Sequence, residues 1–165
     1  LAVGRHGLMG KQNLYEHSVR VPLLLAGPGI PRGETREAYA YLYDIFPTLC
    51  ELLDVPVPDS VDGQSLLPAI ADPAERVRPS LYCAYRDLQR SVRDERYKLI
   101  EYVVNGRRTT QLFDLATDPW ELDNRAGDPA AETTVARLRQ ELLRWREATD
   151  DTGEEGLRFW AGFDG

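Results

Sequence analysis

The spacing of hydrophobic residues changes near residue 79, so two stretches of the chain have different predicted architectures. In the first stretch, residues 21–26 form an apolar run without alternation that ends at a Gly-Pro turn, which is typical of a strand buried on both faces of a sheet. Residues 44–53 follow with apolar positions at helical spacing behind Asp44, which we expect to act as the N-cap. A short helix is expected at residues 65–71. A strand followed by helices favours an α/β layer.

After residue 79 the period becomes that of short strands. Four β-prone segments follow, at residues 81–85, 89–93, 97–104 and 109–114. The pair Asn105-Gly106 separates the last two segments, and both of its residues accept the positive φ that a two-residue hairpin turn requires. The pattern therefore predicts a small antiparallel sheet of four strands. Residues 131–148 show an apolar face at helical spacing, and we expect that helix to pack on the sheet.

The tail at residues 156–163 contains three aromatic residues. Two interpretations stay open for it, a strap packed across the parent domain or a contact to substrate. Cys50 and Cys83 both lie in apolar patterns and are expected to be small buried hydrophobic residues. Two cysteines are too few for a disulfide framework, and with His6 and His17 they do not have zinc-ligand spacing.

Composition narrows the class of partner. The 165 residues carry a formal net charge of −7, and Lys and Arg form no stripe along any predicted helix, so neither nucleic acid nor an anionic membrane surface is an expected partner. No apolar run approaches the roughly 20 residues that a membrane span requires. The first residues show no pattern of a signal peptide, and the sequence makes no prediction of localisation.

Polar groups concentrate among glycines at residues 4–16, just before the apolar run. Loops at strand ends of α/β sheets are common ligand sites, and glycine allows close approach of the backbone. Lys11 is one of only two lysines in the chain and could be a point charge for an oxyanion or an ordinary surface residue. The second lysine, Lys98, is expected on a solvated strand face. Glu16 and Arg20 are interpreted as an ion pair that fixes the loop.

Six blocks resemble the sulfatases of the alkaline phosphatase superfamily, in family order and across most of the chain. The first block is His-Gly-Leu-Met-Gly-Lys ending at Lys11, and the second combines Leu-Tyr-Glu, Arg-Val-Pro-Leu and Gly-Pro-Gly. They are followed by Asp-Ile-Phe-Pro-Thr-Leu from Asp44 and by Asp-Gly-Gln-Ser-Leu from Asp62. The last signatures are Arg-Asp-Glu-Arg-Tyr-Lys ending at Lys98 and Leu-Phe-Asp-Leu-Ala-Thr-Asp-Pro-Trp-Glu ending at Glu121. Asp114 and Asp118 within the last block are interpreted as turn and cap residues.

The resemblance implies an α/β fold: the end of an alkaline-phosphatase-like α/β sandwich at residues 1–78, and an antiparallel four-stranded sheet with a packed helix at residues 79–165. It implies that Lys11 contacts the sulfate group and is the catalytic residue of this chain. His6 is a further candidate for substrate binding, and it could either donate to substrate or orient the loop. The parent enzyme would use a formylglycine nucleophile and a divalent metal, usually calcium.

The chain itself lacks the expected nucleophile and metal ligands. Neither Cys50 nor Cys83 lies in the Cys-x-Pro-x-Arg context that precedes formylglycine, and the family's Asp-Asn-Gly or Asp-His-Gly ligand triplet would end just before Leu1. We therefore expect a truncated sequence that binds no metal and is inactive by itself. An unpaired strand at residues 21–26 also predicts poor solubility.

Three functions remain open at this point. The first is a sulfuric ester hydrolase acting on a sulfated small molecule or saccharide. The second is a phosphonate or phosphodiester hydrolase of the same superfamily, which shares the lysine-bearing loop. The third is a non-catalytic binding or structural module derived from a sulfatase. The sequence does not name the sulfate ester or the oligomeric state.

Overall fold

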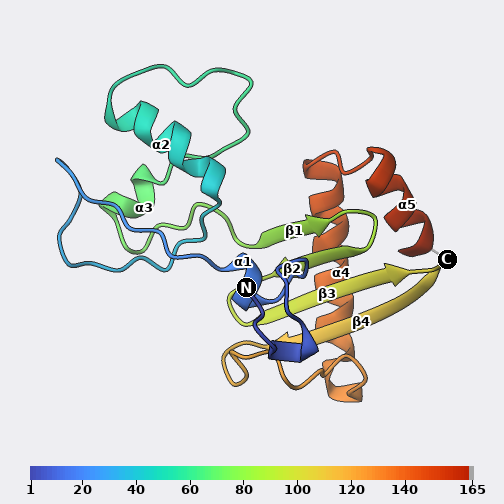
Figure 1. Cartoon of the computed structure of the whole chain (residues 1–165). Helices are drawn as coiled ribbons and strands as arrows, with labels where there is room; N and C mark the ends of the chain where they lie inside the picture. Colours follow the sequence, from blue (N-terminus) through green and yellow to red (C-terminus); the bar gives the residue numbers. More distant parts are fainter. Residues whose placement is uncertain (164–165) are drawn as a thin grey trace. The chain divides into compact units, whose positions relative to one another are not determined.

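The computed structural model describes residues 1–163, in two compact units (Figure 1). The larger unit combines Leu1–Val21 with the chain from Ser80 onward, and the smaller unit is Pro22–Pro79. The boundary between the smaller unit and the rest of the larger unit therefore follows residue 79, where the spacing of hydrophobic residues changes. Residues 1–21 belong to the same unit as the four strands. That residues 1–78 complete one large domain in a longer protein stays a prediction.

The larger unit is built on the predicted antiparallel sheet, which the structure confirms. Its strands are β1 (Leu81–Tyr85), β2 (Gln89–Arg93), β3 (Tyr97–Val104) and β4 (Arg107–Asp114), in the order β1-β2-β3-β4. Each strand pairs with the next in the sequence, so the sheet is a simple meander. The turn between β3 and β4 has φ of 51° at Asn105 and 71° at Gly106, the left-handed conformation that this pair was expected to adopt.

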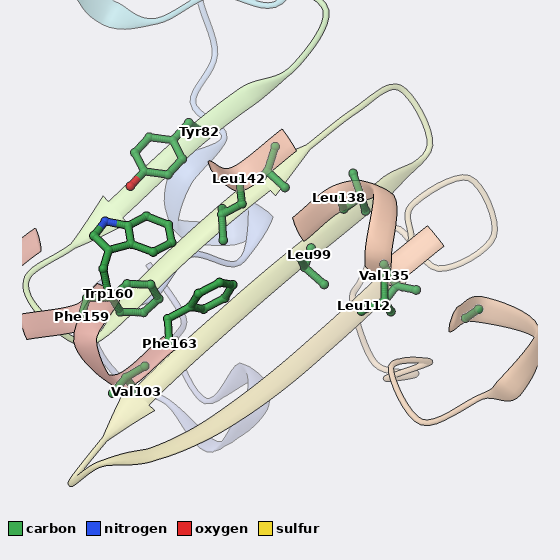
Figure 2. Packing of buried hydrophobic residues seen from close by; sticks show 12 residues of the cluster. Tyr82, Leu99, Val103, Leu112, Val135, Leu138, Leu142, Phe159, Trp160 and Phe163 are labelled. Atoms are coloured by element: carbon green, nitrogen blue, oxygen red, sulfur yellow. The ribbon is translucent and has the colours of Figure 1, made fainter. Parts of the chain in front are cut away.

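One face of the sheet is covered by α4 (Glu132–Ala148) and α5 (Glu154–Phe163), with the short turn η3 (Pro129–Ala131) leading into α4. Figure 2 shows their apolar side chains meeting those of the strands. The helix face of Val135, Leu138 and Leu142 is buried as predicted, and Leu99 on β3 lies in the same cluster. Burial of these spaced apolar positions, rather than helix propensity, fixes α4 on the sheet.

The aromatic tail is a helix of this unit, and the sequence pattern did not indicate it. In α5, Phe159, Trp160 and Phe163 are buried against the sheet (Figure 2). Asp151, just before α5, accepts hydrogen bonds from Tyr82 Oη at 2.6 Å and from Trp160 Nε1 at 2.9 Å. It also pairs with Arg90. The strap across another domain and the substrate contact are both untested, but within this unit the tail completes the core.

The opposite face of the sheet is covered by the start of the chain, with η1 (Arg5–Gly7) and α1 (Glu16–Val19). Leu14 and Tyr15 are buried there in a second cluster with Ile100 of β3 and Phe113 of β4. Alternate residues of β3 therefore face two different layers, helices on one side and residues 1–21 on the other. Figure 1 shows the blue N-terminal segment across the sheet from α4.

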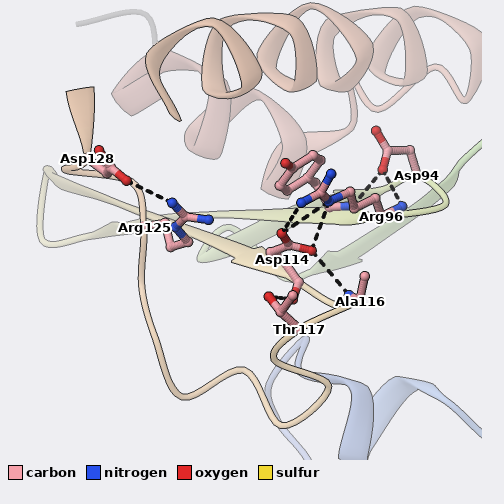
Figure 3. Close-up of polar contacts among 8 residues, drawn as sticks. Asp94, Arg96, Asp114, Ala116, Thr117, Arg125 and Asp128 are labelled. Carbon is pink, nitrogen blue, oxygen red and sulfur yellow. Dashed lines mark hydrogen bonds and ion pairs between the residues drawn. The ribbon is translucent and has the colours of Figure 1, made fainter. Parts of the chain in front are cut away.

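The end of β4 is held by the carboxylate of Asp114 (Figure 3). Arg96 Nη2 donates to Asp114 Oδ2 at 2.7 Å, and Ala116 N donates to Oδ1 at 3.3 Å. The hydrogen bond from Arg96 is the main reason why the pKa of Asp114 is lowered. Asp118 Oδ2 accepts from Asp123 N at 2.8 Å. Both aspartates are turn residues, in agreement with the sequence interpretation.

The smaller unit contains η2 (Leu42–Asp44), α2 (Ile45–Leu52) and α3 (Leu67–Ala71). Asp44 precedes α2 at the N-cap position, but its side chain makes no cap hydrogen bond to the helix. Instead its carboxylate is fully buried and forms two hydrogen bonds with Arg78, of 2.7 and 2.8 Å. Gln64 N donates to the same carboxylate at 2.9 Å, so Asp44 joins three segments of this unit. The two helices agree with the predicted ranges.

One expectation was wrong for the described residues, the buried strand at residues 21–26. Residues 21–26 are extended but pair with no strand among residues 1–163, and Leu24 is 87% exposed. An apolar run becomes a buried strand only beside partner strands, and the described chain supplies none for it. The apolar face of α2 is also partly open, with Leu49 and Leu53 exposed while Cys50 is buried. Cys83 in β1 is half-buried, and both cysteines are free thiols.

Candidate active-site loop

The loop that carries the predicted site residues is anchored to the sheet by Tyr15. The Tyr15 side chain is buried and its hydroxyl donates to Gln111 Oε1 on β4 at 2.9 Å. Its ring lies 6.0 Å from that of Phe113, centroid to centroid. Since β4 is a paired strand of the sheet, these contacts give the loop a rigid support.

The loop also closes on itself through backbone hydrogen bonds. Ala2 N donates to Gly10 O at 2.9 Å, and Gly4 N donates to Leu8 O at 2.7 Å. Gly4 has a φ of 92°, which side-chain-bearing residues rarely adopt, so this turn requires glycine. His6 has a φ of 53°, in the left-handed region where asparagine, aspartate and histidine are enriched among residues that carry a side chain. His6 therefore suits the left-handed position inside this closed turn.

His6, Tyr15 and His17 form one aromatic stack. The rings of His6 and Tyr15 are 4.1 Å apart and within 2° of parallel, and those of His6 and His17 are 5.6 Å apart. Nε2 of His6 and both ring nitrogens of His17 are buried without a hydrogen-bond partner among the described residues. Burial, followed by the charge of His6, lowers the pKa of His17. The stack fixes the ring of His6, whereas donation from His6 to substrate stays a prediction.

Lys11 is exposed, and the backbone on its C-terminal side is fixed. After Gln12, the three residues from Asn13 to Tyr15 are all buried, and Asn13 Oδ1 accepts a hydrogen bond from Tyr15 N at 3.2 Å. Lys11 N donates to the side chain of Gln12 at 3.1 Å. The structure thus presents the Lys11 ammonium to solvent from a supported loop, while the stack is made of His6, Tyr15 and His17.

A charge cluster at the end of this loop consists of Lys98 and Glu121, which are buried, and of Glu16 and Arg93, which are half-buried. Lys98 Nζ is 3.1 Å from Glu16 Oε1 and 3.0 Å from Glu121 Oε1. Arg93 pairs with the other carboxylate oxygen of Glu16. The expectation of a solvated Lys98 was wrong, since only 1% of this residue is exposed. The predicted ion pair between Glu16 and Arg20 was also wrong. Arg20 is exposed, and Glu16 pairs instead with Arg93 of β2 and Lys98 of β3.

Glu121 binds the backbone of the loop directly. Its Oε2 accepts a 2.7 Å hydrogen bond from Glu16 N. Burial raises the pKa of Glu121 above its ordinary value, and the nearby charge of Lys98 opposes that rise. Glu121 itself has a φ of 58°. Sequence reasoning did not single it out, although the last family block ends on this residue.

The described residues do not fit a divalent metal. Residues 1–163 contain no group of three or more His, Cys, Asp or Glu side chains placed to hold an ion. The two glutamates of the charge cluster already face Lys98, and we assign no ion to this chain. Among the described helices, none combines the length and apolar character of a membrane span.

Comparison with known proteins identifies the class of this fold. A curated relative, the multifunctional alkaline phosphatase superfamily protein PehA of Trinickia caryophylli, is 32% identical over 87% of this chain and 32% of its own length. Choline-sulfatase of Rhizobium meliloti is 38% identical over 82% of this chain and 27% of its own. A crystal structure described as a sulfatase from Bacteroides thetaiotaomicron has a TM-score of 0.71 and 28% identity, over 84% of this chain and 32% of that one. These are hydrolases of the alkaline phosphatase superfamily.

The particular family follows from a match to nearly the whole chain. Residues 4–148 match the family described as N-sulphoglucosamine sulphohydrolase, C-terminal. The chain belongs to this family of sulfatase C-terminal regions, which confirms the resemblance of the six sequence blocks. It spans about a quarter to a third of the length of the relatives it matches.

Proposed function

We propose that this chain is the C-terminal part of a sulfuric ester hydrolase and that Lys11 is its contribution to catalysis. One observation carries the proposal: Lys11 is exposed on a loop whose following residues are buried on the sheet. An exposed cation on a supported backbone can meet a ligand without the loss of order that a mobile loop would suffer. The family supplies the reaction class.

Lys11 would stabilise negative charge on the sulfate oxygens as the ester bond breaks. A charge pair at about 4 Å interacts by roughly 4 kcal/mol where the effective dielectric constant is near 20. Removal of one preorganised group of this kind commonly lowers the rate by about 10²–10³. His6 would either donate to the substrate or only hold the loop through its stack on Tyr15.

The nucleophile and the metal ligands of the reaction would come from outside these 165 residues. We propose a divalent metal there, with calcium as the ion that the family resemblance suggests. The substrate class would be a sulfated small molecule or saccharide, since relatives are named choline-sulfatase and N-sulphoglucosamine sulphohydrolase. Since the second function left open by the sequence is a phosphonate or phosphodiester hydrolase, a phosphonate monoester is the necessary comparison substrate.

The test is steady-state kinetics of the full-length enzyme with an aryl sulfate and an aryl phosphonate monoester. We expect Lys11→Ala to lower kcat/KM for the sulfate ester by about 10²–10³. Arg107→Ala, which removes an exposed cation from the β3–β4 hairpin, is the control and should leave the rate unchanged. Equal rates for Lys11→Ala and the unmodified enzyme would refute the role of Lys11. A preference for the phosphonate ester would refute the sulfatase assignment.

The role of His6 can be separated with two variants. His6→Phe keeps a flat ring that can stack on Tyr15 but has no donor, whereas His6→Ala loses both. If His6 only orients the loop, His6→Phe keeps most of the activity that His6→Ala loses. If His6 donates to substrate, the two variants are equally impaired, because the missing N–H is common to both.

A further inference from the structure

The charge cluster of Glu16, Arg93, Lys98 and Glu121 lies where β2, β3 and the segment after β4 meet the loop of Lys11. Lys98 comes from the middle of the sheet, 82 residues after Glu16 in the sequence. Glu121 is 105 residues after Glu16, and it binds both the Glu16 backbone and the Lys98 ammonium. Arg93 is the second cation on Glu16. One glutamate of the loop is therefore held by two strands of the C-terminal sheet and by the segment after β4.

The position of this cluster affects Lys11 because only a short, mostly buried segment joins Lys11 to Glu16. Only four residues separate Lys11 from Glu16, and the last three of them, Asn13 to Tyr15, are buried. Moving the Glu16 backbone would therefore move the base of the Lys11 loop. Burial of Lys98 and Glu121 is costly unless each charge is paired, so loss of one partner should disrupt the whole arrangement of the cluster.

Resting on the proposed function, we infer that Lys98 and Glu121 are positioning residues for Lys11. Lys98 attracts Glu16 and Glu121 together, and the Glu121 carboxylate accepts the Glu16 N–H. Neither residue touches the substrate in this arrangement, since both are buried under the loop. Through Lys98, the C-terminal sheet thereby sets the position of an active-site cation that lies more than 80 residues before Lys98 in the sequence.

A double-mutant cycle in the full-length enzyme tests the inference. We expect Lys98→Met to lower kcat for the sulfate ester by about 10- to 100-fold, because displacements of about 1 Å commonly have effects of that size. In a Lys11→Ala background the same substitution should change kcat by less than about threefold, since the residue it positions is gone. Lys98→Arg, which keeps a cation, should recover part of the loss. Equal effects of Lys98→Met in both backgrounds would overturn the inference.

A matched control exists on the other face of the same strand. Glu101 of β3 is also fully buried and paired, with Arg108 and Arg139, but it faces the α4 side of the sheet. Glu101→Gln disturbs the sheet without touching the loop. Its effect on kcat should be the same with and without Lys11, which is the behaviour of a merely structural residue.

Hydrogen exchange separates failure of this inference from failure of the proposed function. In the full-length protein, Lys98→Met and Glu121→Gln should speed amide exchange in residues 4–12, whereas Glu101→Gln should not. If Lys11→Ala leaves activity intact, the role proposed for Lys11 fails, and faster exchange still shows that the cluster anchors the loop. Unchanged exchange in residues 4–12 with Lys98→Met would refute the anchoring itself.

Discussion

The attachment of α5 to the sheet depends on one carboxylate, and Asp151→Asn tests it. The asparagine keeps the shape of the side chain but removes its charge. Asp151 Oδ2 accepts from Tyr82, Trp160 and Arg90 Nε, and Oδ1 accepts from Arg90 Nη2 at 3.0 Å. The Arg90 side chain is only 2% exposed, so the substitution leaves a buried cation without its anion.

The magnitude follows from these contacts. Removing one partner of a buried ion pair costs about 3–5 kcal/mol, and hydrogen bonds to charged groups contribute about 1.5–3 kcal/mol each. The Asp151 side chain is 17% exposed, and Arg90 keeps hydrogen bonds to two backbone carbonyls. We therefore expect the low end, about 3 kcal/mol. At about 1.4 kcal/mol per factor of ten, this corresponds to roughly 100-fold more frequent opening of α5.

Amide exchange in α5 measures that opening without requiring reversible global unfolding. The control is Asp150→Asn, because Asp150 is the preceding residue and its exposed carboxylate accepts only from Thr152 among the hydrogen bonds described. Asp150→Asn should leave α5 exchange unchanged. If Asp151→Asn also changes exchange in residues 154–163 by less than twofold, the carboxylate does not hold the helix, and the reasoning from buried charge is refuted.

The pH dependence gives an independent check on Asp151. Burial by itself raises the pKa of Asp151, but hydrogen bonds from Arg90 and Tyr82 outweigh it, and the pKa is lowered. A carboxylate with a lowered folded-state pKa stabilises the protein above its unfolded pKa of about 3.9. That stabilisation is lost as pH falls through the folded pKa. The difference in Tm between wild type and Asp151→Asn should therefore be full at pH 6 and shrink below about pH 4.

Two other predictions concern close packing and buried charge. In Gly162→Ala, the added Cβ would lie 2.5 Å from Val103 Cγ1, so overpacking should lower the free energy of unfolding in urea by about 1–3 kcal/mol. Adding Val103→Ala to the same chain should restore part of this stability. If the double variant is no more stable than Gly162→Ala, the steric explanation is contradicted. In the smaller unit, Arg78→Met leaves the fully buried Asp44 carboxylate without its cation and should cost about 3–5 kcal/mol. Limited proteolysis of residues 22–79 should report that loss, and Arg78→Met combined with Asp44→Asn should recover most of it; equal cleavage of both variants would argue against the charge as the cause.

The parts of the fold that the sequence predicted are those set by neighbouring residues. The turn at Asn105-Gly106 depends on two adjacent backbone conformations, and the α4 face depends on apolar spacing within one helix. Strand pairing in a meander also joins sequence neighbours, so the four strands followed from their separators. The family blocks located the loop of His6 and Lys11 for the same reason, since the motif is continuous.

The parts that were missed depend on distant residues. Lys98 looked solvated because its partners Glu16 and Glu121 are 82 and 23 positions away, and strand periodicity carries no information on them. The α5 helix was missed because Gly156 and Gly162 argue against a helix. Both glycines instead allow close contacts, with Asp151 and with Val103. The prediction of a buried strand at residues 21–26 was wrong for the described chain, because such a strand needs partner strands and residues 1–163 supply none.

The sheet lies between residues 1–21 and the helices after residue 131, so the loop of Lys11 is translated well before the residues that support it. Glu16 leaves the ribosome 105 residues before Glu121, which at about 5–20 residues per second is a delay of roughly 5–20 s. During that interval the segment carrying Lys11 has been translated but its supporting surface has not. A nonsense codon shortly before position 121 would therefore spare Lys11 but remove both Glu121 and the helices that cover the other face of the sheet, so the presence of Lys11 in the translated segment would not preserve its support.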